Sequence, residues 1–179
     1  MRCLNKYRWV KLPRTQIPTG NSLLGNFIRL YASAAYRPGQ AHYCQYINEV
    51  RFGEWIGGIV GLKSILGLSS REQALSVLED LSDWGLLEYD YNPKSKRLSY
   101  RILQTQHAAV PPQGTPAYAR EQGFLCLPRT LTQPLIQAGY VFEETDAWLD
   151  LWIHTIYQDS GSPLSNIVPL VQFDDGAAL

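Results

Sequence analysis

The feature that most constrains the fold of this chain is the order of structural signals between residues 53 and 103. Apolar residues occupy 59–66 at the spacing of one helical face, and Gly67 follows where glycine commonly ends a helix. A Leu-Ser-Ser turn then precedes a second helical pattern that extends to about Trp84. Two strand-like segments, joined by the turn residues 92–95, complete the pattern. The sequence therefore predicts helix, tight turn, helix and β-hairpin in that order.

This order resembles the winged helix-turn-helix superfamily. Its recognition-helix pattern is carried by Ala74, with a serine four residues before it and leucines four and seven residues after it. The motif Trp-Val-Lys-Leu-Pro-Arg at 9–14, followed by an aromatic-rich helix, extends the resemblance to DnaD-like, replisome-organiser-type proteins of phages and conjugative elements of Firmicutes. The resemblance covers residues 1–103 and implies an α+β, mainly α fold.

In that superfamily the second helix enters the major groove and the hairpin, or wing, contacts phosphates. The resemblance therefore implies DNA contacts by four residues at the start of the second helix and three on the wing. Arg71 would bind guanine and Gln73 adenine. The implied contact residues are Ser70, Arg71, Gln73, Ser76, Lys94, Lys96 and Arg97.

The charge of this second helix departs from that of a typical DNA-binding helix. Over 70–84 it carries one base, Arg71, against Glu72, Glu79, Asp80 and Asp83, a net charge of −3. We expect the rear acids to face away from DNA and Glu72 to act as a helix cap. A structural or partner-binding role for this helix stays open.

Parts of the chain recur at an offset of about 120 residues. The repeat pairs Leu12–Thr15 with Leu127–Thr130, 27–31 with 148–152, and 50–53 with 171–176. We interpret it as a duplicated module. The predicted organisation is a winged-helix unit at 1–103, a Pro-rich linker at 104–123, and an incomplete second copy at 124–179.

Each predicted copy begins with a short extended segment and continues with an amphipathic helix, at 22–36 in the first copy and 143–157 in the second. In the second helix we expect Trp148, Leu151, Trp152 and Ile156 to face the core. The acids Glu143, Glu144, Asp146 and Asp150 are interpreted as a solvated face rather than a carboxylate site.

The net charge of zero conceals an uneven distribution. Residues 1–48 carry seven bases and no acid, whereas 103–179 carry two bases and eight acids. Neutral charge overall argues against a generally sticky nucleic-acid binder. The asymmetry favours either a polyanion contact near the start of the chain or pairing between its two ends.

Motifs for catalysis or cofactor binding are missing from the sequence. Cys3, Cys44 and Cys126 have no CxxC spacing, the three histidines are scattered, and neither a phosphate loop nor GxGxxG is present. We therefore expect no enzyme, no metal and no cofactor. Without an apolar run of ~18–20 residues or a leader-like segment, a soluble cytoplasmic protein is expected.

Two functional hypotheses remain. The first is a non-catalytic DNA-binding protein of a mobile genetic element, acting on double-stranded DNA in replication initiation or transcriptional regulation. The second is a winged-helix protein-binding module, such as an anti-CRISPR-like nuclease inhibitor, or an oligomerisation scaffold. Homo-oligomers and a protein partner of the acidic C-terminal half are compatible with both.

Overall fold

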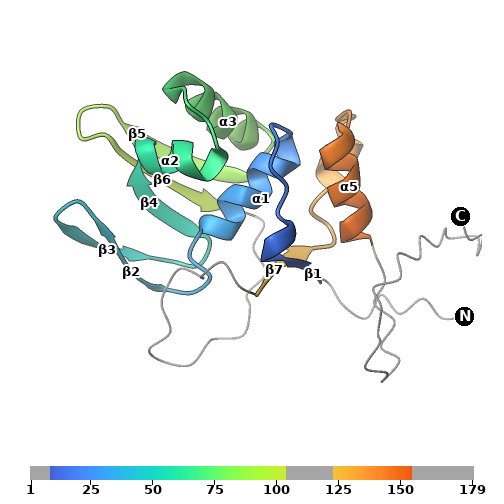
Figure 1. Cartoon of the computed structure of the whole chain (residues 1–179), viewed down its shortest axis with the longest axis horizontal. Helices are drawn as coiled ribbons and strands as arrows, with labels where there is room; N and C mark the ends of the chain where they lie inside the picture. Colours follow the sequence, from blue (N-terminus) through green and yellow to red (C-terminus); the bar gives the residue numbers. More distant parts are fainter. Residues whose placement is uncertain (1–8, 104–122, 155–179) are drawn as a thin grey trace, which may run out of the picture.

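The computed structural model describes residues 9–103 and 123–154 (Figure 1). These residues are 39% helix and 29% strand, which confirms the α+β class with a larger strand share than a mainly helical fold has. The elements are β1 (Trp9–Pro13), η1 (Arg14–Gln16), α1 (Leu23–Ser33), β2 (Gly39–Tyr43), β3 (Tyr46–Val50), β4 (Glu54–Gly58), α2 (Ile59–Leu66), α3 (Arg71–Asp83), β5 (Leu87–Asn92), β6 (Arg97–Ile102), β7 (Phe124–Pro128), α4 (Gln133–Gln137) and α5 (Glu144–Ile153). The predicted linker residues 104–122 and the predicted strand at 171–176 lie outside this description.

The helix–turn–helix–hairpin order is confirmed with boundaries close to those predicted. Gly67, at φ +68°, ends α2, and Gly85, at φ +66°, follows α3. Both glycines have the left-handed backbone that other residues adopt at a cost. Strands β4, β6 and β5 form an antiparallel sheet in that order. One apolar core joins this sheet to α1, α2 and α3 through side chains such as Leu62, Leu78 and Leu98.

The two predicted copies pack together through a second sheet. Strand β1 pairs antiparallel with β7, and the central pair of the register is Lys11 with Cys126. Val10 and Leu127, which face each other in this register, are fully buried. Helix α5 packs against both α1 and β1 (Figure 1). Residues 123–154 therefore complete the same core as residues 9–103.

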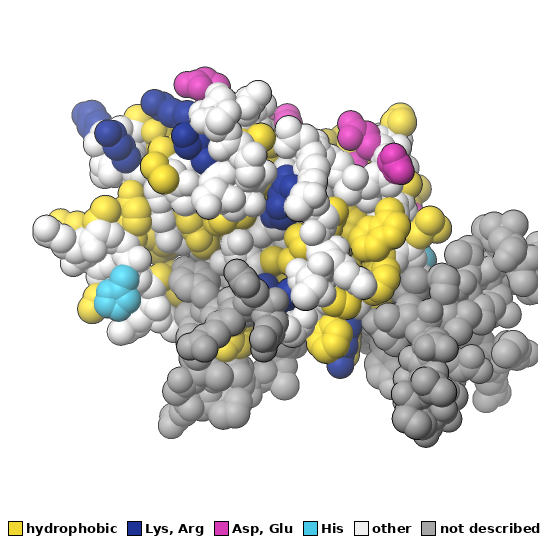
Figure 2. Space-filling view, viewed as in Figure 1, with side chains coloured by type: hydrophobic (Ala, Val, Ile, Leu, Met, Phe, Trp, Pro, Cys, Tyr) yellow, Lys and Arg dark blue, Asp and Glu magenta, His cyan; other side chains and the backbone are white. Residues whose placement is uncertain are grey.

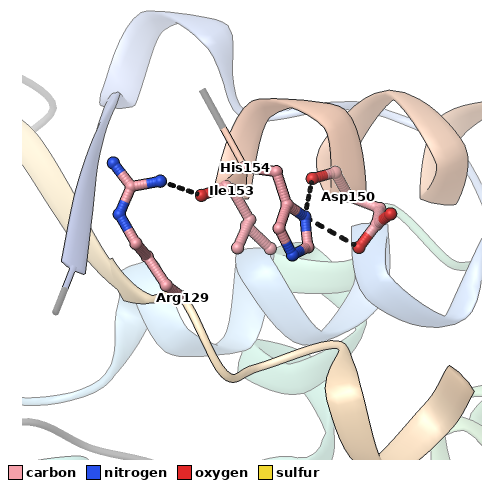
Figure 3. A network of polar contacts seen from close by, with 4 residues as sticks. All are labelled: Arg129, Asp150, Ile153 and His154. Atoms are coloured by element: carbon pink, nitrogen blue, oxygen red, sulfur yellow. Dashed lines mark hydrogen bonds and ion pairs between the residues drawn. The ribbon is translucent and has the colours of Figure 1, made fainter. Parts of the chain in front are cut away.

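Residues that the repeat aligns make corresponding hydrogen bonds within each copy. Arg14 Nη1 donates to the carbonyl oxygen of Ala32 at 2.8 Å, near the end of α1. Its counterpart Arg129 donates through Nη1 to the carbonyl oxygen of Ile153 at 2.8 Å, at the end of α5 (Figure 3). The repeat aligns Ala32 with Ile153, so the two arginines have equivalent partners.

A second matched pair of hydrogen bonds crosses between the copies. The Tyr31 hydroxyl donates to the carbonyl oxygen of Cys126 at 3.1 Å, and Trp152 Nε1 donates to the carbonyl oxygen of Lys11 at 3.2 Å. The two donors are aligned by the repeat, and so are the two acceptors. This matched pattern is what an approximate two-fold axis near the centre of the β1–β7 pair would produce. The tandem repeat stays a prediction, and these contacts favour it.

The predicted core face of the second helix is wrong for Trp148 and Leu151, whereas Trp152 is half-buried against the core and Ile156 lies outside the described residues. In α5 the buried residues are Asp146, Leu149 and Ile153. Trp148 and Leu151 are 41% and 55% exposed. Both sets of residues recur at helical spacing, so periodicity alone did not distinguish them.

The interpretation of Asp146 as part of a solvated face is also wrong, because its exposed fraction is 0%. Its Oδ1 accepts a hydrogen bond from the backbone N–H of Leu24 at 3.0 Å, and its Oδ2 accepts one from the Tyr140 hydroxyl at 2.8 Å. Burial, with this hydrogen bond to Asp146, raises the pKa of Tyr140 well above its usual value. The carboxylate therefore connects the first turn of α1 to α5 and to the segment before it.

At the other end of α5, His154 Nδ1 lies 3.4 Å from Asp150 Oδ1 (Figure 3). The hydrogen bond to Asp150 raises the pKa of His154 above its ordinary 6.5. Burial raises the pKa of Asp150, but hydrogen bonding, chiefly to His154, lowers it by more, so the net pKa is below 3.8. The charged pair therefore stabilises the fold most between those two ordinary pKa values.

This pair predicts a pH-dependent effect of His154→Gln. The stabilisation from His154 is complete below its unfolded pKa of 6.5 and disappears as pH rises through the raised folded value. We expect the substitution to lower the free energy of unfolding by less than about 1 kcal/mol at about pH 5.5, since the pair is partly exposed, and by almost nothing at about pH 8.5. Urea unfolding at both pH values measures this, and an equal loss at both would contradict it.

No helix in the described ranges has both the length and the apolar character needed to cross a membrane.

Candidate nucleic-acid interface

The turn between α2 and α3 determines where α3, the helix expected to contact DNA, begins. Lys63 Nζ donates to the carbonyl oxygen of Ser69 at 2.9 Å, which holds the turn against α2. Ser70 is the N-cap of α3, and its Oγ accepts from the backbone N–H of Gln73 at 3.4 Å. Ser70 therefore serves the helix as a cap, a role that competes with a contact to DNA.

The N-cap of α3 is Ser70, not Glu72, which lies in the first turn and bonds to the Ser70 side chain. The Ser70 hydroxyl donates to Glu72 Oε2 at 2.8 Å. A hydrogen bond from its own backbone N–H, followed by that of Ser70, lowers the pKa of Glu72 below its usual value. An acid at this position is favoured by the exposed N–H groups at the helix start.

Arg71 connects the start of α3 to the hairpin. Its guanidinium carbon lies 5.5 Å from the centroid of the Tyr91 ring in β5, a cation–π contact. The side chain of Arg71 is nevertheless exposed. It therefore lies beside the wing with its charge accessible from solvent.

The wing turn presents the other three predicted basic residues. Asn92 Oδ1 accepts hydrogen bonds from the backbone N–H groups of Lys94 and Ser95 at 3.0 and 3.1 Å, an Asx-type turn that sets the tip. Lys96 follows with a left-handed backbone, φ +55°. Lys94, Lys96 and Arg97 are all exposed. Figure 2 shows Lys and Arg side chains gathered over the β5–β6 hairpin.

Gln73 and Ser76 lie apart from this basic group. They line a groove of about 410 Å³ whose opposite wall includes Asn26, Tyr140 and Glu143. Arg71 and the wing residues do not line this groove. The seven predicted contact residues therefore form two groups, four basic residues by the wing and two polar residues in a groove, with Ser70 between them as a cap.

The exposed side of α3 is acidic. Ala74, Leu78 and Leu81 are buried, so the opposite side of the helix carries Ser76 together with the acids. Glu72, Glu79, Asp80 and Asp83 are all exposed. The rear acids therefore share the side of the helix that a major groove would contact. Within α3 only Arg71 has a charge that attracts phosphates, and the exposed bases of the wing turn, Lys94, Lys96 and Arg97, add to it.

The β2–β3 hairpin next to the wing was not predicted. The Tyr43 hydroxyl donates to the carbonyl oxygen of Lys96 at 3.2 Å, and a Cβ at Gly58 would lie 2.6 Å from that hydroxyl oxygen. Near the tip of the β2–β3 hairpin, Tyr46 and Ile47 have exposed fractions of 73% and 61%. Its loop lacks the Asn-Gly or Asp-Gly pair that marks a two-residue hairpin in sequence.

Among the described side chains, no three His, Cys, Asp or Glu residues gather in a way that would hold a metal ion. Comparison with protein-family models, curated protein sequences and solved structures finds no significant match to this chain.

Proposed function

We propose that this chain is a non-catalytic protein that binds double-stranded DNA through a winged helix-turn-helix unit formed by α2, α3 and the β4–β6–β5 sheet. The observation that carries the proposal is a set of four exposed basic residues at the start of α3 and on the wing, Arg71, Lys94, Lys96 and Arg97. The Arg71 guanidinium lies over the ring of Tyr91, which precedes the wing turn in β5. Phosphate contacts of this kind supply most non-specific affinity for DNA.

The acidic side of α3 decides how the unit would approach the duplex. Four exposed carboxylates would face the phosphates if the whole helix lay in the major groove. We therefore propose that the first turn of α3 and the wing make the main contacts, with Arg71 able to reach a guanine edge. Gln73 and Ser76 would contact bases only where the groove that holds them opens toward the duplex.

The biological setting is proposed from the resemblance to DnaD-like proteins. On that basis the chain acts in the cytoplasm for a mobile genetic element, in replication initiation or transcriptional regulation. A role in oligomeric assembly or in recruiting a protein partner accompanies DNA binding in this proposal.

A protein-binding module is the second candidate function. The groove between α3 and the 140–143 segment favours it, because the groove joins apolar Leu68 and Trp84 to Asp80 and Glu143. A partner with a basic residue beside an apolar one would match this lining. An inhibitor of a nuclease or a scaffold would act through such a surface and would not need the basic wing.

The Arg71→Ala substitution tests the proposed DNA contact. Arg71 supplies a charge next to the wing, so we expect its loss to weaken binding to a mixed-sequence duplex by about tenfold, or 1.4 kcal/mol. Fluorescence anisotropy titration at low salt measures this. Arg101→Ala is the matched control, because Arg101 is also exposed but is bonded to Glu88 at 2.7 Å.

The control should change the affinity by less than about twofold, since exposed ion pairs contribute little. Equal affinities for wild type and Arg71→Ala would remove the start of α3 from the interface. Duplex binding that is absent altogether, with a folded protein, would favour the protein-binding module.

A further inference from the structure

The approximate two-fold relation between the copies exposes a difference between α1 and α5. The repeat aligns Phe27 with Trp148 and Leu30 with Leu151. Phe27 and Leu30 have exposed fractions of 0%, because α1 packs against α2 and α3. The carbonyl oxygen of Leu30 also accepts a hydrogen bond from the Tyr100 hydroxyl at 2.9 Å.

The same positions of α5 are uncovered. Trp148 and Leu151 are 41% and 55% exposed, and the Trp148 ring lies 5.5 Å, centroid to centroid, from the ring of Trp152. Figure 2 shows hydrophobic side chains gathered over α5. We call Trp148, Leu151 and Trp152 the α5 face. Large apolar side chains grouped in this way mark interaction surfaces more often than isolated ones do.

Charge at the two ends of α5 indicates what kind of partner fits the face. Glu144 lies one turn before Trp148, so it shares the exposed side of the helix, and Glu143 precedes it. The opposite end carries Arg129, which bonds to the carbonyl oxygen of Ile153, and His154, which is paired with Asp150 of the same helix (Figure 3). The face is therefore apolar in the middle, acidic at one end, and bordered at the other by Arg129 beside a neutral His154–Asp150 pair.

Two copies of this face are complementary when they are related by a two-fold rotation, so that the acidic end of each meets the opposite end of the other. We propose that the α5 face pairs two copies of this chain, with the two α5 helices antiparallel across a two-fold axis. Trp148 and Leu151 of each copy then pack on those of the other, and Glu144 of each lies toward Arg129 of its partner. Antiparallel pairing also opposes the two helix dipoles favourably, whereas parallel pairing would bring the acidic ends together.

The oligomeric state of the full chain tests this proposal. We expect wild type to be a dimer by light scattering after size exclusion and by sedimentation, and Leu151→Glu to raise the dimer dissociation constant at least about tenfold. Val60→Glu is the matched control, because Val60 is 75% exposed on α2 and lies outside the α5 face. Leu151 is exposed, so both variants should keep the wild-type circular dichroism spectrum. Loss of the dimer should lower the melting temperature of Leu151→Glu at concentrations where wild type is dimeric.

A charge exchange tests the orientation of the two helices. Glu144→Lys alone should weaken the dimer, and adding Arg129→Glu should restore at least part of the loss, since the exchanged charges would face each other again. Wild type that stays a monomer up to its solubility limit would overturn the proposal and assign the α5 face to another segment or partner. A dimer unaffected by Leu151→Glu would overturn it as well. DNA binding by the monomeric variant is a separate readout, so the two proposals can fail independently.

Discussion

Asp146→Ala is expected to lower the free energy of unfolding by about 2–4 kcal/mol, the largest effect of any polar substitution proposed for this chain. Its carboxylate is fully buried and accepts from both Leu24 N–H and the Tyr140 hydroxyl. Truncation to alanine leaves both donors without a partner in a dry environment, which costs more than the loss of the two bonds in water. Urea unfolding followed by tryptophan fluorescence measures the change.

Two further variants test whether the loss of stability comes from the buried carboxylate of Asp146. Asp146→Asn keeps an acceptor for the Leu24 N–H, so its loss should be smaller, about 1–2 kcal/mol. Glu144→Ala removes an exposed acid from the same helix and should stay within about 0.5 kcal/mol of wild type. If Asp146→Ala were as stable as Glu144→Ala, the Asp146 carboxylate would not hold α5 to α1 in solution.

The second large effect is expected on the wing. We predict that the triple variant Lys94/Lys96/Arg97→Ala weakens duplex DNA binding by at least about tenfold at low salt. It should also flatten the slope of log K against log salt by about 2.7, or about 0.9 for each phosphate that the protein no longer neutralises. The three side chains are exposed at the wing turn, so the fold should be unchanged. Anisotropy titrations at several salt concentrations measure both quantities.

The control variant Lys11/Arg51/Arg101→Ala distinguishes a local effect of the wing from an effect of the protein's net charge. It also removes three positive charges, but from exposed positions outside the wing turn. We expect its salt slope to stay within about one of the wild-type slope. Similar slopes for the two triple variants would mean that the wing makes no local contact with phosphates.

Local signals explain why the helix-turn-helix and its hairpin could be predicted from sequence. Gly67, Gly85 and Asn92 need only their neighbours to define an end or a turn, and Ser70 needs only the helix that it caps. Such features are encoded within a few residues. The boundaries therefore followed from the sequence to within about a residue or two.

The face that α5 buries depends on contacts that a local pattern does not contain. Asp146 is buried because it bonds to Leu24, 122 residues away. Leu149 and Ile153 recur at helical spacing just as Trp148 and Leu151 do, so the periodicity fits either face. The large aromatic side chain of Trp148 suggested a core position. The aligned positions of α1 are covered by α2 and α3, whereas Trp148 and Leu151 of α5 are exposed.

The candidate interface was predicted in part for a similar reason. The sequence identified the basic residues of the wing and Arg71, whose guanidinium lies over the ring of Tyr91 in the hairpin. It did not show that Gln73 and Ser76 line a groove with Tyr140 and Glu143, because those two residues are more than 60 positions away in the sequence.

Whether the basic surface around the wing binds DNA is tested most directly by titrating wild-type protein into a labelled mixed-sequence duplex over a salt series. With four basic side chains in contact with phosphates, we predict binding at low salt whose log K falls linearly with log salt at a slope of about −3.6. No anisotropy change at the lowest salt, with the protein shown to be folded in the same buffer, would contradict this prediction.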